Sequence, residues 1–141
     1  MFITKDKISA ILRVEDSKVF YPSKDFYIPK FYFYKHCIEF FSIFLKVYNI
    51  RYTEIFNCVR YSDLFKLVCY FKYDKLFMRD KKEGLGIASV FYLRDDGVSH
   101  VVNLIVYEQD KLIDFKFFEP QSLNIINLSD TEKDNVKYII F

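Results

Sequence analysis

The first half of the chain shows the periodicity of helices. Residues 2–28 are expected to form short extended pieces and turns, because their aromatic segments run into Pro22 and Pro29. Between Lys30 and Tyr48, polar residues then recur every three or four positions on an otherwise apolar segment. They are Lys35, Glu39, Ser42 and Lys46, followed by Asn49. This spacing predicts a helix with one narrow polar stripe and an otherwise buried circumference.

A second helix is predicted from Cys58 to about Phe71, with Asn57 as its N-cap residue. The side chains expected to face inward from it are Tyr61, Leu64, Phe65 and Val68. The charged segment from Lys72 to Glu83 is interpreted as a solvated surface loop. Its apolar residues 76–78 are expected to pack back onto the core.

The second half changes to β-branched and aromatic runs separated by turn residues. Three antiparallel strands are predicted at Leu85 to Leu93, Val98 to Tyr107 and Leu112 to Phe118. A short strand, a polar turn and a last strand are expected to follow at Ser122 to Leu128, Ser129 to Asn135 and Val136 to Phe141. Because the predicted helices precede the predicted antiparallel sheet along the chain, we expect one α+β domain over residues 1–141.

Composition narrows the class of protein. The chain has 141 residues, of which 52% are hydrophobic and 28% charged, so it can bury a core and is not typical of a disordered segment. The net charge of +2 is too balanced for an electrostatic nucleic-acid binder. Charges interrupt the most apolar stretch, Phe31 to Ile50, and the N-terminus lacks the pattern of a signal peptide. We therefore expect a cytoplasmic protein that binds neither nucleic acid nor a membrane.

The cysteines do not suggest a metal site. There are three, without C-x-x-C spacing, so we predict neither a structural metal nor a disulfide scaffold, and no cofactor. Cys37 and Cys69 lie in apolar helical segments and are interpreted as core residues. Cys58 is different, because the first turn of a helix stabilises a thiolate through the helix dipole and unpaired N–H groups. Taken alone, Cys58 is still more simply a structural residue.

Two histidines are available to such a thiol. His36 lies within the first helix beside its polar stripe and is interpreted as a partly exposed helix residue. His100 lies early in the central predicted strand. An imidazole near a thiol raises the reactive fraction of that thiol near neutral pH. Cys58 and His100 are therefore the candidate reactive pair.

Several motifs resemble those of a known family. They are the glycine-containing first strand GLGIASVFY, the segment SHVVNLIV from Ser99 to Val106, the segment FFEPQS from Phe117 to Ser122, and YIP and YTEIFNC upstream. Together, from about Tyr27 to Ser122, they resemble the papain-like domain at the C-terminal end of fungal agglutinins and related small bacterial and phage proteins.

The resemblance implies a papain-like α+β fold and roles for individual residues. Cys58 matches the nucleophile, His100 the base and Glu119 the acid that orients the imidazole, with Gln121 in support. Such a site implies a thiol-dependent peptidase or acyl hydrolase, whose partner would be a peptide or protein. Asn103 points to the opposite strand face from His100 and is interpreted as a buried structural amide.

The chain departs from the family pattern next to Cys58. Val59 and Arg60 replace the acidic residues that usually follow the cysteine, and no glutamine precedes it. If those acidic residues bind calcium in active members of the family, this chain lacks these calcium ligands. The departures favour an alternative, in which a phage-encoded, catalytically degenerate protein serves interaction or virion structure in the host cytoplasm or the virion. A third interpretation is a plain structural domain with a hydrogen-bonded pair of His100 and Glu119.

Overall fold

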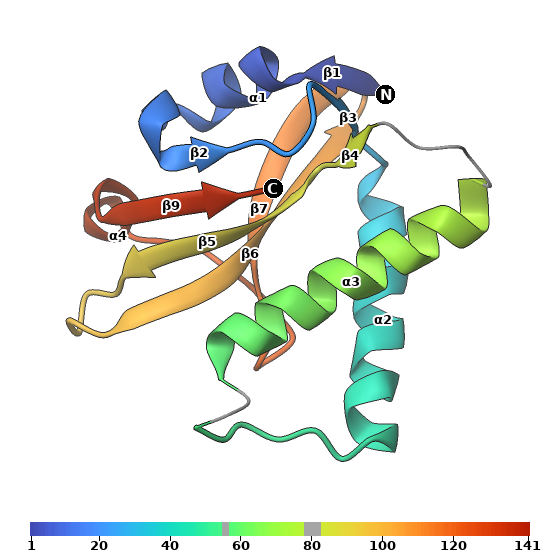
Figure 1. The fold of residues 1–141 in the computed structure, drawn as a ribbon, viewed down its shortest axis with the longest axis vertical. Coiled ribbons are helices and arrows are strands. Elements are labelled where there is room, and N and C mark those ends of the chain that lie inside the picture. The colour runs from blue at the N-terminus through green and yellow to red at the C-terminus, as the bar shows by residue number, and fades with distance from the viewer. Residues whose placement is uncertain (55–56, 78–82) are drawn as a thin grey trace.

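The computed structural model describes residues 1–54, 57–77 and 83–141. These residues form an α+β structure, as the sequence predicts (Figure 1). The helices are α1 (Lys5–Leu12), the 3-10 turn η1 (Asp16–Lys18), α2 (Phe31–Val47), α3 (Cys58–Phe77) and α4 (Asp130–Asp134). The strands are β1 (Phe2–Thr4), β2 (Val19–Phe20), β3 (Asp25–Tyr27), β4 (Gly84–Leu85), β5 (Ile87–Leu93), β6 (Ser99–Gln109), β7 (Leu112–Glu119), β8 (Asn124–Ile126) and β9 (Val136–Ile140).

Within the described residues the strands form two sheets. The larger sheet has the order β2-β9-β5-β6-β7-β8, and β5, β6 and β7 are consecutive antiparallel neighbours at its centre. β9 pairs antiparallel with β5 and carries β2 as a parallel edge strand. The smaller sheet has the order β1-β3-β4. Helix α3 packs on β6 and β5, and α2 packs on α3 and β6 (Figure 1).

Strand β6 divides the core into two clusters because its side chains alternate between the two faces of the sheet. Val102 and Leu104 belong to the cluster that also contains residues of the N-terminal segment and β9. Ile105 and Tyr107 belong to the cluster formed with α2 and α3. Burial of one such aliphatic side chain contributes about 1.5–3 kcal/mol to stability. Because β6 supplies buried side chains to both clusters, it connects them.

The predicted first helix is present as α2, but its predicted burial is wrong. The buried residues of α2 are Phe33, Tyr34, Cys37 and Phe41. Its large apolar side chains that face solvent are Tyr32 and Ile43, followed by Val47 and the C-cap residue Tyr48. The reason is that α2 packs against α3 and β6 on one side, so its opposite side stays open.

The second predicted helix begins where expected. The Asn57 side-chain oxygen accepts a hydrogen bond from the Val59 amide at 3.1 Å, which confirms Asn57 as the N-cap. The helix continues to Phe77, so the expected loop from Lys72 to Glu83 is wrong for its first part. Tyr73 explains the extension, because it is fully buried and continues the inward-facing side of α3. Met78 of the apolar segment lies outside the described residues, as do residues 55 and 56 of the connector.

Two short helices were not predicted. Helix α1 lies where extended pieces were expected, and of its residues only Ile8 is buried, so an apolar stripe was hard to detect. Helix α4 replaces the expected polar turn. Its start is fixed by a capping box in which Ser129 and Glu132 bond to each other's backbone amides.

The strand predictions of the second half are confirmed, except that the predicted strand from Leu85 to Leu93 is divided. Leu85 belongs to β4 in the smaller sheet and Ile87–Leu93 form β5 in the larger sheet, so the chain passes from one sheet to the other at Gly86. The turn between β6 and β7 is tight because Asp110 and Lys111 both adopt left-handed backbone angles, with φ of 51° and 65°. This is the two-residue geometry that matches the twist of paired strands. Among the described residues, no helix is long and apolar enough to span a membrane.

Candidate functional site

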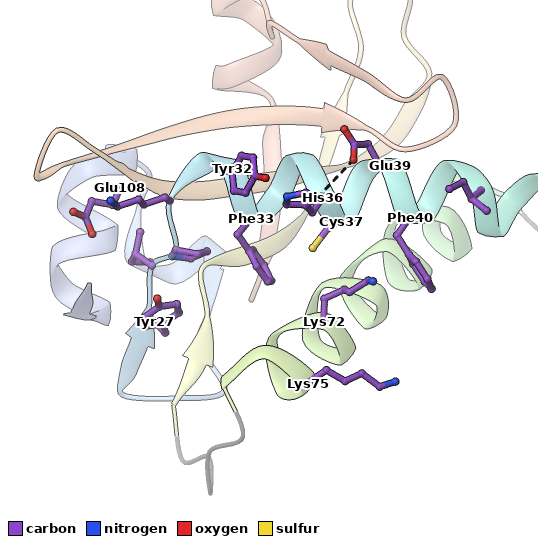
Figure 2. Close-up of a pocket in the computed structure, with 14 residues that line it drawn as sticks. Tyr27, Tyr32, Phe33, His36, Cys37, Glu39, Phe40, Lys72, Lys75 and Glu108 are labelled. Atoms are coloured by element: carbon purple, nitrogen blue, oxygen red, sulfur yellow. Dashed lines mark ion pairs between the residues drawn. The ribbon is translucent and has the colours of Figure 1, made fainter.

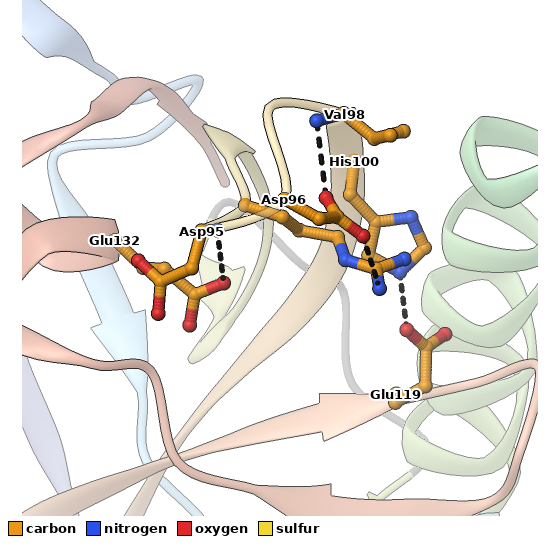
Figure 3. A network of polar contacts seen from close by, with 7 residues as sticks. Asp95, Asp96, Val98, His100, Glu119 and Glu132 are labelled. Atoms are coloured by element: carbon orange, nitrogen blue, oxygen red, sulfur yellow. Dashed lines mark hydrogen bonds and ion pairs between the residues drawn. The ribbon is translucent and has the colours of Figure 1, made fainter.

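The start of β6 and the end of β7 bring His100 and Glu119 together. His100 Nε2 and Glu119 Oε2 form a short hydrogen bond (Figure 3). Their side chains are only 12% and 13% exposed. A carboxylate can only accept, so Nε2 is the donor of this bond. Among the described residues, Nδ1 has no hydrogen-bond partner of its own.

Glu119 is held by a second donor. Its Oε1 accepts a hydrogen bond from the backbone amide of Gln121 at 3.1 Å, across the turn that contains Pro120. Both carboxylate oxygens are therefore engaged, and the carboxylate orientation is fixed. The Gln121 side-chain nitrogen is buried and has no hydrogen-bond partner among the described residues. Such a donor is costly unless a water or ligand oxygen satisfies it.

Tyr92 forms the neighbouring wall of this site. It pairs with His100 across the β5–β6 ladder, and the two rings meet edge to face with 6.0 Å between their centroids. Burial, and then the charges of Glu132 and Glu119, raise the pKa of Tyr92 to about 12. The phenol therefore stays neutral near His100 at physiological pH.

Cys58 is the first residue of α3 and is half-buried. Its position at the helix start places it near unpaired backbone amides and the positive end of the helix dipole. No hydrogen bond joins the Cys58 sulfur to His100 within the described part of the chain. The structure therefore brings His100, Glu119 and Gln121 together, and the participation of Cys58 and the chemical roles of all four residues stay predictions.

A buried polar cluster connects α3 to the sheet next to this site. Asn103 Nδ2 donates to the Ser62 carbonyl at 3.2 Å, to Ser62 Oγ at 3.0 Å and to the Ala88 carbonyl at 3.3 Å. Ser62 Oγ and Ser89 Oγ are 2.7 Å apart. Asn103 was expected to be a buried amide, whereas the two serines gave no signal in the sequence. Serines are common on exposed helix and strand positions, so their burial depends on tertiary contacts.

The other cysteines and the other histidine lie outside the His100–Glu119 pair. Cys37 and Cys69 are fully buried, as expected, and burial raises the pKa of the Cys69 thiol well above its ordinary value, with Cys37 adding to the shift. His36 is half-exposed, and its Nδ1 lies 3.6 Å from Glu39 Oε2. Among the described residues, no group of three or more His, Cys, Asp or Glu side chains is arranged to hold a metal ion.

A groove of about 850 Å³ lies between α2, the end of β3 and α3 (Figure 2). Its aromatic lining consists of Tyr27, Tyr32, Phe33 and Phe40. Its polar and charged lining consists of Lys30, His36, Glu39, Lys72, Lys75 and Glu108. The sequence did not indicate this groove, because it is formed by the spacing of two helices and not by a motif.

The charges in the groove are unequally paired. Glu39 is close to His36, and Glu108 lies 3.5 Å from the N-terminal ammonium group. Lys72 lies over the Phe40 ring at 4.0 Å, and Lys75 lies over the ring of Phe71. In the described part of the chain, neither of these ammonium groups has a carboxylate partner. The groove therefore offers uncompensated positive charge beside aromatic surface.

Comparison with known proteins identifies the fold. No protein-family model matches the chain, and no curated protein matches it. Among solved structures, the PSL1a–E64 complex superposes with a TM-score of 0.71 at 16% identity over 99% of this chain and 51% of that chain. Polyporus squamosus lectin, bound to the human-type influenza-binding epitope Neu5Acα2-6Galβ1-4GlcNAc, gives 0.69 at 18% identity over 99% of this chain and 49% of that chain. This chain thus spans about half the length of the chains that it matches.

These neighbours correct the predicted family and function. The second neighbour is a lectin, so the assignment to a papain-like protease domain is wrong, and with it the predicted peptidase or acyl hydrolase and the degenerate papain-like phage protein. The motifs behind that assignment lie on adjacent strands, where the pairing of β6 with β7 sets the spacing of His100 and Glu119. Strand pairing is a property of the fold, and a fold alone assigns no activity. A peptide or protein partner is likewise unsupported.

Proposed function

We propose that this chain binds a carbohydrate and that the ligand lies in the groove between α2 and α3. The observation that carries the proposal is the fold shared over 99% of the chain with a lectin whose structure contains Neu5Acα2-6Galβ1-4GlcNAc. The chain corresponds to about half of that lectin, and our proposal is that this half binds the glycan. The composition of the groove is the reason for choosing this location.

The groove suits a sugar chemically. The hydrogen-bearing faces of pyranose rings pack on aromatic side chains, and Tyr32 presents such a ring at 68% exposure. A few polar groups beside an apolar surface are typical of small-ligand sites because they fix orientation. Neu5Ac carries a carboxylate, and Lys72 and Lys75 on α3 present ammonium groups that have no carboxylate partner among the described residues.

Isothermal titration with Neu5Acα2-6Galβ1-4GlcNAc tests this function. We expect saturable binding that weakens about tenfold in Tyr32→Ala, because the stacking ring is lost. Tyr48→Ala is the matched control, since Tyr48 is similarly exposed at 65% at the end of the same helix but does not line the groove. Absence of binding by the unchanged protein, or equal losses in the two variants, contradicts the proposal.

We also propose a second ligand site, formed by Cys58, His100, Glu119 and Gln121. The observation that favours it is the solved complex of PSL1a with E64, together with the fixed His100–Glu119 pair and the unsatisfied buried amide of Gln121. A thiol at a helix start and an imidazole with a free Nδ1 supply a reactive sulfur and a proton acceptor. The proposal is that this site takes E64.

Native mass spectrometry with E64 tests the second site. We expect one bound E64 per chain, lost in Cys58→Ser and reduced in His100→Ala. His36→Ala is the matched control, because His36 is an exposed histidine on α2 outside this site and should leave E64 binding unchanged. Binding that survives in Cys58→Ser and His100→Ala would exclude these residues from the E64 site.

A further inference from the structure

The groove between α2 and α3 carries different charges on its two sides. Tyr32, His36 and Phe40 line it at intervals of four residues, so they form one ridge along α2. Glu39 lies about 100° around the helix from Phe40. In Figure 2 the Glu39 carboxylate points away from Lys72 and from α3. The acidic group of α2 is thus directed away from the wall that α3 contributes.

Lys72 supplies the positive charge of the α3 wall. The residue is half-buried, and its ammonium nitrogen lies 4.0 Å from the centroid of the Phe40 ring. This cation–π contact holds the ammonium group against the ridge of α2, toward which the side chain reaches in Figure 2. Among the described residues the ammonium group has no carboxylate partner. It can therefore form a charge-assisted hydrogen bond with an anionic group of a ligand.

The other lysines that line the groove are placed differently. Lys75 lies 4.9 Å from the centroid of the Phe71 ring, and Phe71 does not line the groove. Lys30 is exposed at the start of α2, where its backbone pairs with that of Glu108, so charges of both signs lie together there. Within the described part of the chain, Lys72 is therefore the groove lysine that an aromatic residue of the groove holds in place.

We propose that Lys72 makes the groove selective for acidic sugars by binding the sugar carboxylate, whereas Tyr32 packs on a sugar ring whether or not the ligand is charged. This inference rests on the proposed glycan-binding function, and it adds the residue that distinguishes acidic from neutral ligands. An ammonium group attracts a carboxylate more strongly than a neutral ester, whereas packing of a sugar on an aromatic ring does not require a charge. The two contributions can therefore be measured separately.

Isothermal titration with two ligands tests the proposal. One is Neu5Acα2-6Galβ1-4GlcNAc, and the other is its methyl ester, which keeps every sugar ring and removes the charge. At low salt we expect the unchanged protein to bind the acid about tenfold more tightly than the ester, and Lys72→Gln to bind both equally. Lys72→Arg should keep the preference, because a guanidinium group also carries a positive charge and stacks on aromatic rings. Added salt should reduce the preference of the unchanged protein.

Lys35→Gln is the matched control. Lys35 lies on α2 with its ammonium group over the Phe31 ring, but it does not line the groove, so its substitution should leave the preference unchanged. Tyr32→Ala should weaken both ligands by the same factor. If the unchanged protein binds both ligands equally, or if Lys72→Gln keeps the preference, Lys72 does not select acidic sugars although the groove binds a glycan. If neither ligand binds, or if Tyr32→Ala has no effect, the proposed function itself is wrong.

Discussion

At the scale of single residues, the Glu119 carboxylate connects the start of β6 with the turn after β7. It accepts one hydrogen bond from His100 and another from the Gln121 backbone, in a setting where water has little access. A buried group with two charge-assisted bonds is hard to replace, because substitution leaves its donors unpaired. Strand positions alone placed His100 and Glu119 on neighbouring strands. Pro120 indicated a fixed turn before Gln121, but the burial of the Gln121 amide without a partner depends on tertiary packing around that turn.

Substitution of Glu119 should therefore be costly. We expect Glu119→Gln to lower the free energy of unfolding by about 1–3 kcal/mol, because a neutral amide is a weaker acceptor and brings a new donor that must be satisfied. Urea unfolding measures this. Glu39→Gln is the control, since the Glu39 side chain is 73% exposed and, among the residues that the structure describes, pairs with a half-exposed His36 alone. Equal effects of the two substitutions would show that burial of the Glu119 pair adds no stability.

The buried tyrosines predict how stability depends on alkaline pH. Burial is the first cause that raises the pKa of Tyr92 and of Tyr107 from 10.0 to about 12. Between these values the unfolded chain loses the phenol proton and the folded chain keeps it, so stability is complete below about pH 10 and falls as the pH rises toward 12. Urea unfolding across this range should show the decline, and Tyr92→Phe should reduce it. A flat profile would contradict the raised pKa values.

At the scale of elements, the sequence predicted what local periodicity controls. Alternating runs located β5, β6 and β7, and the Asn57 cap located the start of α3. Elements that depend on a few contacts were missed, namely α1 with one buried residue and α4 with its capping box. The groove was missed for a related reason. Its walls come from separate helices, and no periodicity within one helix reports the distance to another.

The cap of α3 gives a prediction at this scale. Asn57→Ala removes the acceptor of the Val59 amide and should lower the free energy of unfolding by about 1 kcal/mol. Asn57→Asp keeps an acceptor at the same place and should have a much smaller effect. Urea unfolding of both variants provides the comparison. If the two variants lose equal stability, the side chain of Asn57 does not cap the helix.

At the scale of the whole molecule, β6 contributes to both hydrophobic clusters. Leu104 faces the N-terminal cluster and Ile105 faces the cluster with α2 and α3, and both are fully buried. Adjacent residues of one strand thus connect two halves of the core. This arrangement supports the proposal that residues 1–141 behave as one domain.

Unfolding should accordingly be cooperative. Leu104→Ala and Ile105→Ala should each lower the free energy of unfolding by about 2–5 kcal/mol, through lost burial and a remaining cavity. Near-ultraviolet and far-ultraviolet circular dichroism should report the same midpoint in each variant, because both clusters unfold together. Separate transitions, with each substitution affecting only one of them, would show two independently folding units.

The central claim, that the groove between α2 and α3 binds a glycan, is tested most directly by nuclear magnetic resonance of the isotope-labelled protein during titration with Neu5Acα2-6Galβ1-4GlcNAc. The amide signals of Tyr32, His36 and Phe40 on α2, and of Lys72 and Lys75 on α3, should shift progressively and saturate. Signals at the opposite edge of the sheet, such as those of β2 and β9, should stay in place. An unchanged spectrum, or shifts confined to residues outside the groove, would contradict the claim.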